Sequence, residues 1–95
     1  MRICEIIGTV TLSRSIPEFQ GATLKLGVPL SLDNLLEKEP PQADSLVVWD
    51  ATGSGMGCRV ALSEGGEAAQ PFRPESKPVD AYAAAILDDI NIEPV

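Results

Sequence analysis

The chain has 95 residues, of which 44% are hydrophobic and 4% aromatic, and its 14 acidic and 7 basic side chains give a net charge of −7. This acidity argues against binding to nucleic acid, whose phosphates require Lys and Arg, and against binding to anionic membrane surfaces. No apolar run approaches the roughly 18–20 residues of a membrane-spanning helix, and the first residues lack the apolar segment of a signal peptide. We expect one domain over residues 1–95 with a modest aliphatic core, which oligomerisation would help to stabilise.

Two strands are predicted in the first third of the chain. Residues 2–12 are rich in β-branched side chains, and Gly8 inside this run indicates a bulge or a sharp bend. Residues 22–30 alternate apolar side chains with polar or small ones, which is the pattern of a half-buried strand. Pairing is expected to stop at Pro29, because proline has no N–H to donate to a neighbouring strand.

Two irregular segments accompany these strands. Residues 13–21 form a loop, judged by their Pro, Gly and Ser content. Its apolar members Ile16 and Phe19 either fold back over the end of the core, which is the favoured interpretation, or contact a partner. Residues 31–45 form a polar excursion in which residues 31–38 predict one or two helical turns, and its acidic side chains are interpreted as a solvated face.

Two more strands flank a glycine-rich stretch. Residues 46–50 and 60–62 are short apolar runs typical of buried strands. Trp49 is predicted to be packed rather than to stack on a cofactor, because a lone aromatic side chain normally serves burial. Residues 63–70 predict a turn followed by a short helical turn.

The last part of the chain predicts a linker, a short helix and a final strand. Residues 71–78 contain three prolines and are interpreted as an irregular linker. Asp80 is the predicted N-cap of a helix over residues 81–85. The residues suited to a last strand are Ile86, Leu87, Ile90 and Ile92. Four or five short strands with little helix predict a mainly β fold that closes into a small barrel and so removes exposed strand edges.

Residues 51–58, the glycine loop, have glycine at every second position from Gly53 to Gly57. Glycine reaches positive φ without a Cβ clash, so this stretch allows a tight backbone path. Its spacing is not the G-x-G-x-x-G of a dinucleotide site, and it lacks the Gly-Lys-Ser/Thr of a phosphate-binding loop. Two interpretations remain open. The loop is either a long hairpin connection or a functional loop that packs against a neighbouring subunit or lines an opening.

The residue types that carry catalysis and metal binding are scarce. The chain has no histidine, which removes the commonest general base and metal ligand. Its two cysteines alone cannot form a structural zinc site and are expected to be reduced in a cytosolic protein. Asp88 and Asp89 are neighbours that would point to opposite faces of a strand. Cys58 beside Arg59 is either a reactive thiol or a half-buried thiol with no role. We therefore predict no enzyme activity, no metal and no cofactor.

Four short motifs, in their order and spacing, carry a resemblance to a known family. They are Met1-Arg2-Ile3-Cys4-Glu5-Ile6-Ile7-Gly8-Thr9-Val10, Gly21 with Leu24, Asp50 followed by Gly53-Ser54-Gly55-Met56-Gly57, and Pro78-Val79-Asp80-Ala81 with Ile86-Leu87-Asp88. Over residues 1–30 and 46–92 the chain resembles the vertex proteins of bacterial microcompartments, the pentameric shell proteins of the EutN/CcmL type. Cys58 stands where these proteins commonly have an acidic residue, Ala85 replaces a frequent Gly, and Gln70 replaces a frequent Arg. These departures leave open the chemistry beside the pore and one contact between subunits.

The resemblance implies a five-stranded barrel of the oligonucleotide/oligosaccharide-binding type. It also implies a homopentamer that closes the five-fold corners of a microcompartment shell in the bacterial cytoplasm, beside hexameric shell proteins. The glycine loop would lie near the ring axis, with Ser54 and Met56 as lining residues. A bulky side chain at position 54 should then narrow the opening and leave assembly intact. The other site residues implied in this way are Gly53, Gly55 and Gly57 in the axis loop, and Asp50, Asp80, Ile86 and Asp88 at the subunit interface.

Two alternatives to a shell protein stay open. One is a free-standing oligomeric module that holds a small anionic or neutral ligand in the glycine loop, at Gly53–Gly57. The other is a redox sensor that uses Cys58.

Overall fold

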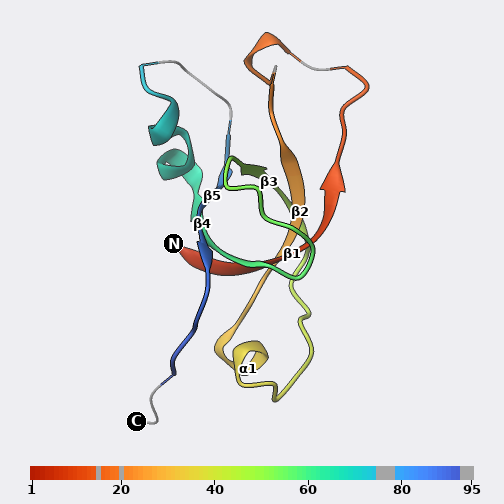
Figure 1. Ribbon diagram of the computed structural model, residues 1–95, viewed down its shortest axis with the longest axis vertical. Coiled ribbons are helices and arrows are strands. Elements are labelled where there is room, and N and C mark those ends of the chain that lie inside the picture. The colour runs from red at the N-terminus through yellow and green to blue at the C-terminus, as the bar shows by residue number, and fades with distance from the viewer. Residues whose placement is uncertain (15, 20, 75–78, 93–95) are drawn as a thin grey trace.

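The computed structural model describes residues 1–14, 16–19, 21–74 and 79–92, and it confirms the predicted small β-barrel. Five strands close in the order β1-β2-β3-β5-β4 (Figure 1). They are β1 (Arg2–Val10), β2 (Leu24–Pro29), β3 (Leu46–Asp50), β4 (Arg59–Glu64) and β5 (Ala81–Leu87). Neighbouring strands are antiparallel except for β3 and β5, which run parallel and pair at only two positions. No helix in the described ranges is long and apolar enough to cross a membrane.

The barrel interior is filled by small and aliphatic side chains. The buried cluster consists of Cys4, Ile6, Val48, Val60, Leu62, Ala81 and Ala83. Gly27 of β2 is part of this fit, because a Cβ at that position would collide with the Cys4 sulfur. Removal of these side chains from water is the main stabilising term for a domain of this size.

The predicted irregularity of the first strand is confirmed. The register of β1 on β2 shifts between Ile6 and Gly8, which is the signature of a bulge. β1 pairs with β4 over Arg2–Glu5 and with β2 over Cys4–Val10. The bulge thus lets a single strand bend around the barrel and serve two neighbours. The pairing of β2 ends at Pro29, as predicted.

The polar excursion contains α1 (Leu32–Leu35), so the helical turn predicted within residues 31–38 is confirmed. Ser31 and Asn34 form a reciprocal capping box, in which each side chain satisfies a free amide at the start of the helix. The Asn34 side-chain amide also donates to the carbonyl oxygens of Glu39 and Pro40, at 3.2 Å each. Figure 1 shows α1 below the barrel, at the end opposite the two 3-10 helices.

Two predictions for the last part of the chain are wrong. Residues 81–85 belong to a strand, because Ala81 and Ala83 are small enough to fill the barrel interior while Tyr82 faces outward, and this packing outweighs the helix propensity of alanine. Asp80 therefore caps no helix, and its carbonyl oxygen accepts from the Gly65 amide at 2.8 Å. The strand ends at Leu87, so Ile90 and Ile92 lie beyond it.

The predicted irregular linker at 71–78 begins inside a second 3-10 helix, η2 (Gly65–Phe72). Pro71 fits there because its fixed φ is compatible with 3-10 geometry. Residues 75–78, the rest of the predicted linker, lie outside the described residues.

All four aromatic side chains of the protein form one row along the parallel β3–β5 seam. The ring centroids are 6.0 Å apart between Phe19 and Trp49, 4.7 Å between Trp49 and Phe72, and 5.5 Å between Phe72 and Tyr82. Trp49 and Tyr82 are register partners on the two strands. Phe19 comes from η1 (Pro17–Phe19) and Phe72 from η2, so the row fastens both 3-10 helices to the seam. Phe19 thus folds back onto the barrel, as predicted, whereas Ile16 keeps 48% of its surface exposed.

Candidate functional site

The glycine loop is built around the carboxylate of Asp50, the last residue of β3. Asp50 is 2% exposed, and each of its oxygens accepts two hydrogen bonds. One oxygen accepts from the amide and hydroxyl of Thr52 at 2.9 and 2.5 Å, and the other accepts from the amide and hydroxyl of Ser54 at 2.9 and 2.8 Å. A buried carboxylate with four donors is fully satisfied, so it fixes the first half of the loop.

The second half of the loop is fixed by main-chain bonds to β1. The Gly57 amide donates to the carbonyl oxygen of Ile6 at 2.7 Å, and the Ile6 amide donates to the carbonyl oxygen of Cys58 at 2.9 Å. Gly53 and Gly57 have φ of 77° and 85°, in the left-handed region that favours glycine. The hairpin interpretation is wrong, because β5 lies between β3 and β4 in the barrel. The loop instead makes main-chain hydrogen bonds to β1 before the chain enters β4.

The hydrogen bonds to Asp50 set its ionisation. Burial alone would raise the pKa of Asp50, but the hydrogen bonds from Thr52 and Ser54 together outweigh burial, so the pKa lies below the usual range of an aspartate. The carboxylate is therefore charged at neutral pH, and its charge strengthens the four bonds that hold the loop.

The two residues predicted to line an opening lie in opposite environments. Met56 is 77% exposed, whereas Ser54 is 1% exposed and its hydroxyl points at Asp50. The Ser54 side chain therefore acts inside the loop. The expectation that a bulky residue at position 54 leaves assembly intact is not supported, since such a residue would displace the Asp50 carboxylate.

The four predicted interface residues divide between the loop and the surface. The Asp50 carboxylate makes its hydrogen bonds within its own loop. An interface role for Asp50 stays a prediction. Asp80 and Asp88 are exposed, and Ile86 keeps 44% of its surface exposed. These three can reach a neighbour, and they belong to two different parts of the surface, before β5 and at its end.

The loop is poorly suited to hold an anion. The amides of Thr52 and Ser54 donate to Asp50, the Gly57 amide donates to β1, and the Gly55 amide donates to the Cys58 sulfur at 3.4 Å. Donors already committed to the protein cannot cradle a ligand, and the loop encloses the negative charge of Asp50. This arrangement gives the loop a structural role.

The cysteines offer little chemistry. Cys4 is fully buried in the barrel, and burial raises the pKa of its thiol to about 11, so it is neutral and shielded. Cys58 is half-buried at the end of the glycine loop.

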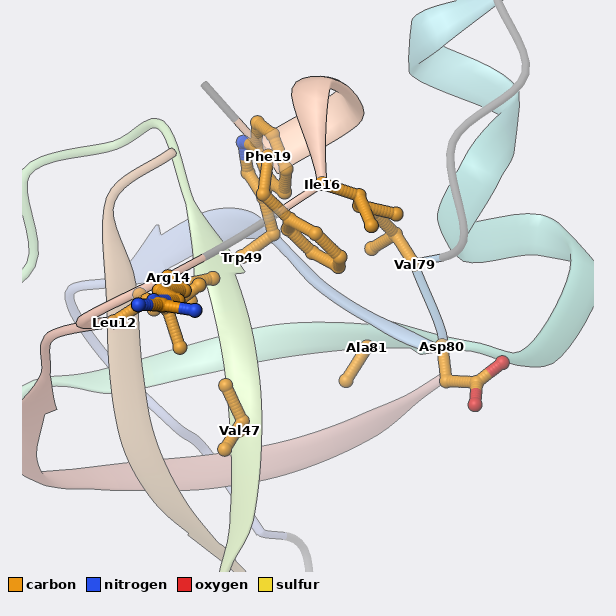
Figure 2. Close-up of a pocket in the computed structure, with 10 residues that line it drawn as sticks. Leu12, Arg14, Ile16, Phe19, Val47, Trp49, Val79, Asp80 and Ala81 are labelled. Atoms are coloured by element: carbon orange, nitrogen blue, oxygen red, sulfur yellow. The ribbon is translucent and has the colours of Figure 1, made fainter. Parts of the chain in front are cut away.

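Sequence reasoning missed an apolar groove of about 480 Å³ on the outside of the barrel. Its apolar wall consists of Leu12, Ile16, Phe19, Leu24, Val47 and Trp49. Val79–Ala81 form the opposite wall (Figure 2). Arg14 lies at one end of the groove, and Asp80 lies at the other with its carboxylate directed away from it. The groove joins three segments that are far apart in the chain, so no local pattern could have revealed it.

Comparisons with known proteins agree with this geometry. The family described as "Ethanolamine utilisation protein EutN/carboxysome" matches residues 1–88. The carboxysome shell vertex protein CcmL of a Nostoc species is 35% identical over 94 residues, which are 98% of this chain and 88% of that protein. The microcompartment shell vertex protein PduN of Salmonella typhimurium is 29% identical over 91 residues, covering 96% and 99% of the two chains.

Solved structures give the same result. The pentameric microcompartment shell protein GrpN of Rhodospirillum rubrum superposes with a TM-score of 0.80 at 28% identity, covering 98% of this chain and all of GrpN. Gloeobacter violaceus CcmL superposes with a TM-score of 0.85 at 28% identity, covering 98% and 91% of the two chains. Sequence and fold match together over almost the whole chain, and the protein therefore belongs to the EutN/CcmL family of microcompartment proteins.

Proposed function

We propose that this protein is a structural, non-enzymatic shell component, and that five copies form a ring at each five-fold vertex of a bacterial microcompartment in the cytoplasm. The observation that carries the proposal is the match over residues 1–88, joined to the superposition on a pentameric shell protein over its entire length. In this proposal the barrel surface provides the contacts between copies, and the glycine loop provides the lining of the ring axis.

A ring of identical copies requires head-to-tail contacts, in which one surface of a copy meets a different surface of the next. Flat layers of hexamers cannot enclose a volume, whereas five-fold units at the corners introduce the curvature that closes a polyhedron. The surface of this small domain carries exposed apolar side chains, including Leu12, Ile16 and Val47 at 48% each. Burial of such side chains between copies would offset the modest core of the monomer.

In the proposed ring the glycine loop lies at the axis. Met56, at 77% exposure, and the backbone of Gly53–Gly57 line any opening, while Ser54 holds the loop from behind through Asp50. A loop that narrows a ring must keep one shape in five copies. The buried carboxylate and the two main-chain bonds to β1 provide that rigidity.

The test is co-expression of hexameric shell proteins with and without this chain, followed by electron microscopy. We expect closed polyhedral particles only when the chain is present, and open or elongated assemblies in its absence. Closed particles of the same number and shape without the chain would contradict the vertex role.

The alternative function for the same loop is that of a ligand-binding module. This alternative predicts saturable binding of a small anion by the isolated protein. The loop amides committed to Asp50, Ile6 and Cys58 argue against it, so we expect no such binding by calorimetry.

A further inference from the structure

The apolar groove exists because the β3–β5 seam is paired along only part of its length. The two strands pair at Trp49 with Tyr82 and at Asp50 with Ala83. Before these positions, Val47 of β3 and Val79–Ala81 stand on opposite walls of the groove. Three of its large apolar side chains, Leu12, Ile16 and Val47, are each 48% exposed. A contiguous apolar surface of this kind on a small soluble protein marks a site of association.

The residues after β5, which we call the C-terminal tail (residues 88–92), have the complementary pattern. The sequence Asp88-Asp89-Ile90-Asn91-Ile92 places isoleucine at every second position behind two carboxylates. In an extended segment these two isoleucines lie on one side. Figure 1 shows the tail running away from the barrel, at the end opposite the loop of residues 12–19 that forms one wall of the groove.

We propose that the apolar groove of one copy receives the C-terminal tail of the next copy, an inference that rests on the ring proposed above. The tail and the loop of residues 12–19, which forms one wall of the groove, lie at opposite ends of the molecule, so the tail of a second copy is the fitting occupant. They are also two different surfaces, as a head-to-tail ring requires. Ile90 and Ile92 of one copy pack against Val47, Leu12 and Ile16 of the other.

Charge gives this contact its direction. Arg14 stands at one end of the groove (Figure 2) and makes no ion pair within the described residues. Asp88 and Asp89 precede the apolar part of the tail. Each copy carries a net charge of −7, so five copies repel one another, and a pairing of Arg14 with these carboxylates counters that repulsion where the copies meet.

A cysteine pair tests the contact directly. The variant combines Val47→Cys in the groove with Ile90→Cys in the tail, and Cys58→Ser removes the half-buried native thiol. Oxidation, or a short bismaleimide linker, should join neighbouring copies into a ladder that ends at five chains on a denaturing gel. The single-cysteine variants are the controls, together with Val47→Cys paired with Leu32→Cys, because Leu32 of α1 is 59% exposed and has no place in the proposed contact.

The outcomes separate this inference from the proposed function. A ring by native mass with no cross-linking of the Val47/Ile90 pair overturns the tail-in-groove contact and leaves the vertex role standing. Equal cross-linking of the Val47/Leu32 pair also overturns it. A wild-type protein that forms no ring removes the proposed function and this inference with it.

Surface substitutions provide an independent test without cross-linking. Val47→Asp should weaken association about tenfold or more, as expected for a residue at the centre of a contact, whereas Leu32→Asp should leave it unchanged. Arg14→Glu should weaken association, and Asp88→Lys with Asp89→Lys in the same chain should restore it. Circular dichroism should report an intact barrel in every variant, because all five positions are exposed. Association by Val47→Asp at the wild-type level would overturn the proposal, as would failure of the charge exchange to restore a weakened ring.

Discussion

The polar excursion at residues 31–45 and the glycine loop at residues 51–58 are both held by one buried polar side chain. Asn34, at 9% exposure, makes hydrogen bonds to Ser31, Glu39 and Pro40. Asp50, at 2% exposure, accepts from Thr52 and Ser54. The Asn34 side chain thus takes part in three hydrogen bonds and the Asp50 carboxylate in four, each within its own connection, and each connection leaves the barrel and returns to it.

The two connections differ in the charge of the buried side chain and in whether the connection also bonds to another strand. Asn34 is neutral and its side chain bonds only within the excursion, whereas Asp50 is a buried anion in a loop that also makes main-chain hydrogen bonds to β1. Hydrogen bonds to a buried charge are stronger than those to a neutral group. Removal of the charged acceptor therefore leaves its donors unsatisfied at a larger cost in free energy. The comparison indicates that the loop is built for rigidity across the barrel end, and that the excursion is an ordered but separable attachment.

Replacement of Asp50 should have the largest effect. Asp50→Ala leaves the donors of Thr52 and the buried donors of Ser54 without an acceptor and should lower the free energy of unfolding by about 3 kcal/mol. Asp50→Asn is the matched control, since its amide keeps one acceptor oxygen and should lose about half as much. Urea denaturation measures both. If Asp50→Ala lost less unfolding free energy than Asp50→Asn, that result would contradict the role of the Asp50 carboxylate in holding the loop.

Replacement of Asn34 should have a smaller and local effect. Asn34→Ala removes the capping box and two bonds to carbonyl oxygens, which should cost about 1–2 kcal/mol. Amide hydrogen exchange should accelerate within residues 31–40 and stay unchanged in the barrel and the glycine loop. Spread of faster exchange into residues 51–58 would show that the two connections are coupled after all.

A fall in pH should reduce the contribution of Asp50 to stability and leave that of Asn34 unchanged. The pKa of Asp50 is lower in the folded protein than in the unfolded chain, so its stabilising effect is complete above about 3.9, the ordinary aspartate value, and is lost as the pH falls towards the folded pKa. The stability gap between wild type and Asp50→Asn should therefore narrow from pH 6 to pH 3. The gap between wild type and Asn34→Ala should stay constant, because no titration is involved. Parallel curves for both variants would contradict this account of Asp50.

The smallest effect should appear in thiol reactivity. Cys58 is half-buried at the end of the glycine loop, whereas Cys4 is fully buried with its pKa raised to about 11. A thiol reagent at pH 8 should label Cys58 in the native protein and Cys4 only after unfolding. Asp50→Ala should speed the labelling of Cys58 by a few-fold through local opening, and Asn34→Ala should not. Equal native labelling of both cysteines would contradict the barrel packing.

The sequence predicted what local patterns control. The bulge near Gly8, the end of β2 at Pro29 and the helical turn after Ser31 follow from glycine, proline and capping residues, whose effects act within a few positions. The closed barrel followed from the number of short strands and from the family resemblance. The helix predicted over residues 81–85 failed because alanine suits both a helix and the inside of a narrow barrel, and only the tertiary contacts decide between them.

The candidate site was predictable only in part, because local patterns identify the loop whereas tertiary contacts decide where its side chains point. The glycine spacing and Asp50 identified the loop, but the inward direction of Ser54 depends on a carboxylate four residues earlier in the chain and on the path the glycines allow. The apolar groove could not be predicted at all, since Leu12, Val47 and Val79 come from segments that only the closed barrel brings together.

Native mass spectrometry of the purified protein tests the central claim most directly. The account predicts one dominant species at five times the chain mass of 10.1 kDa. A monomer or dimer at high protein concentration, or a ring of six, would contradict it.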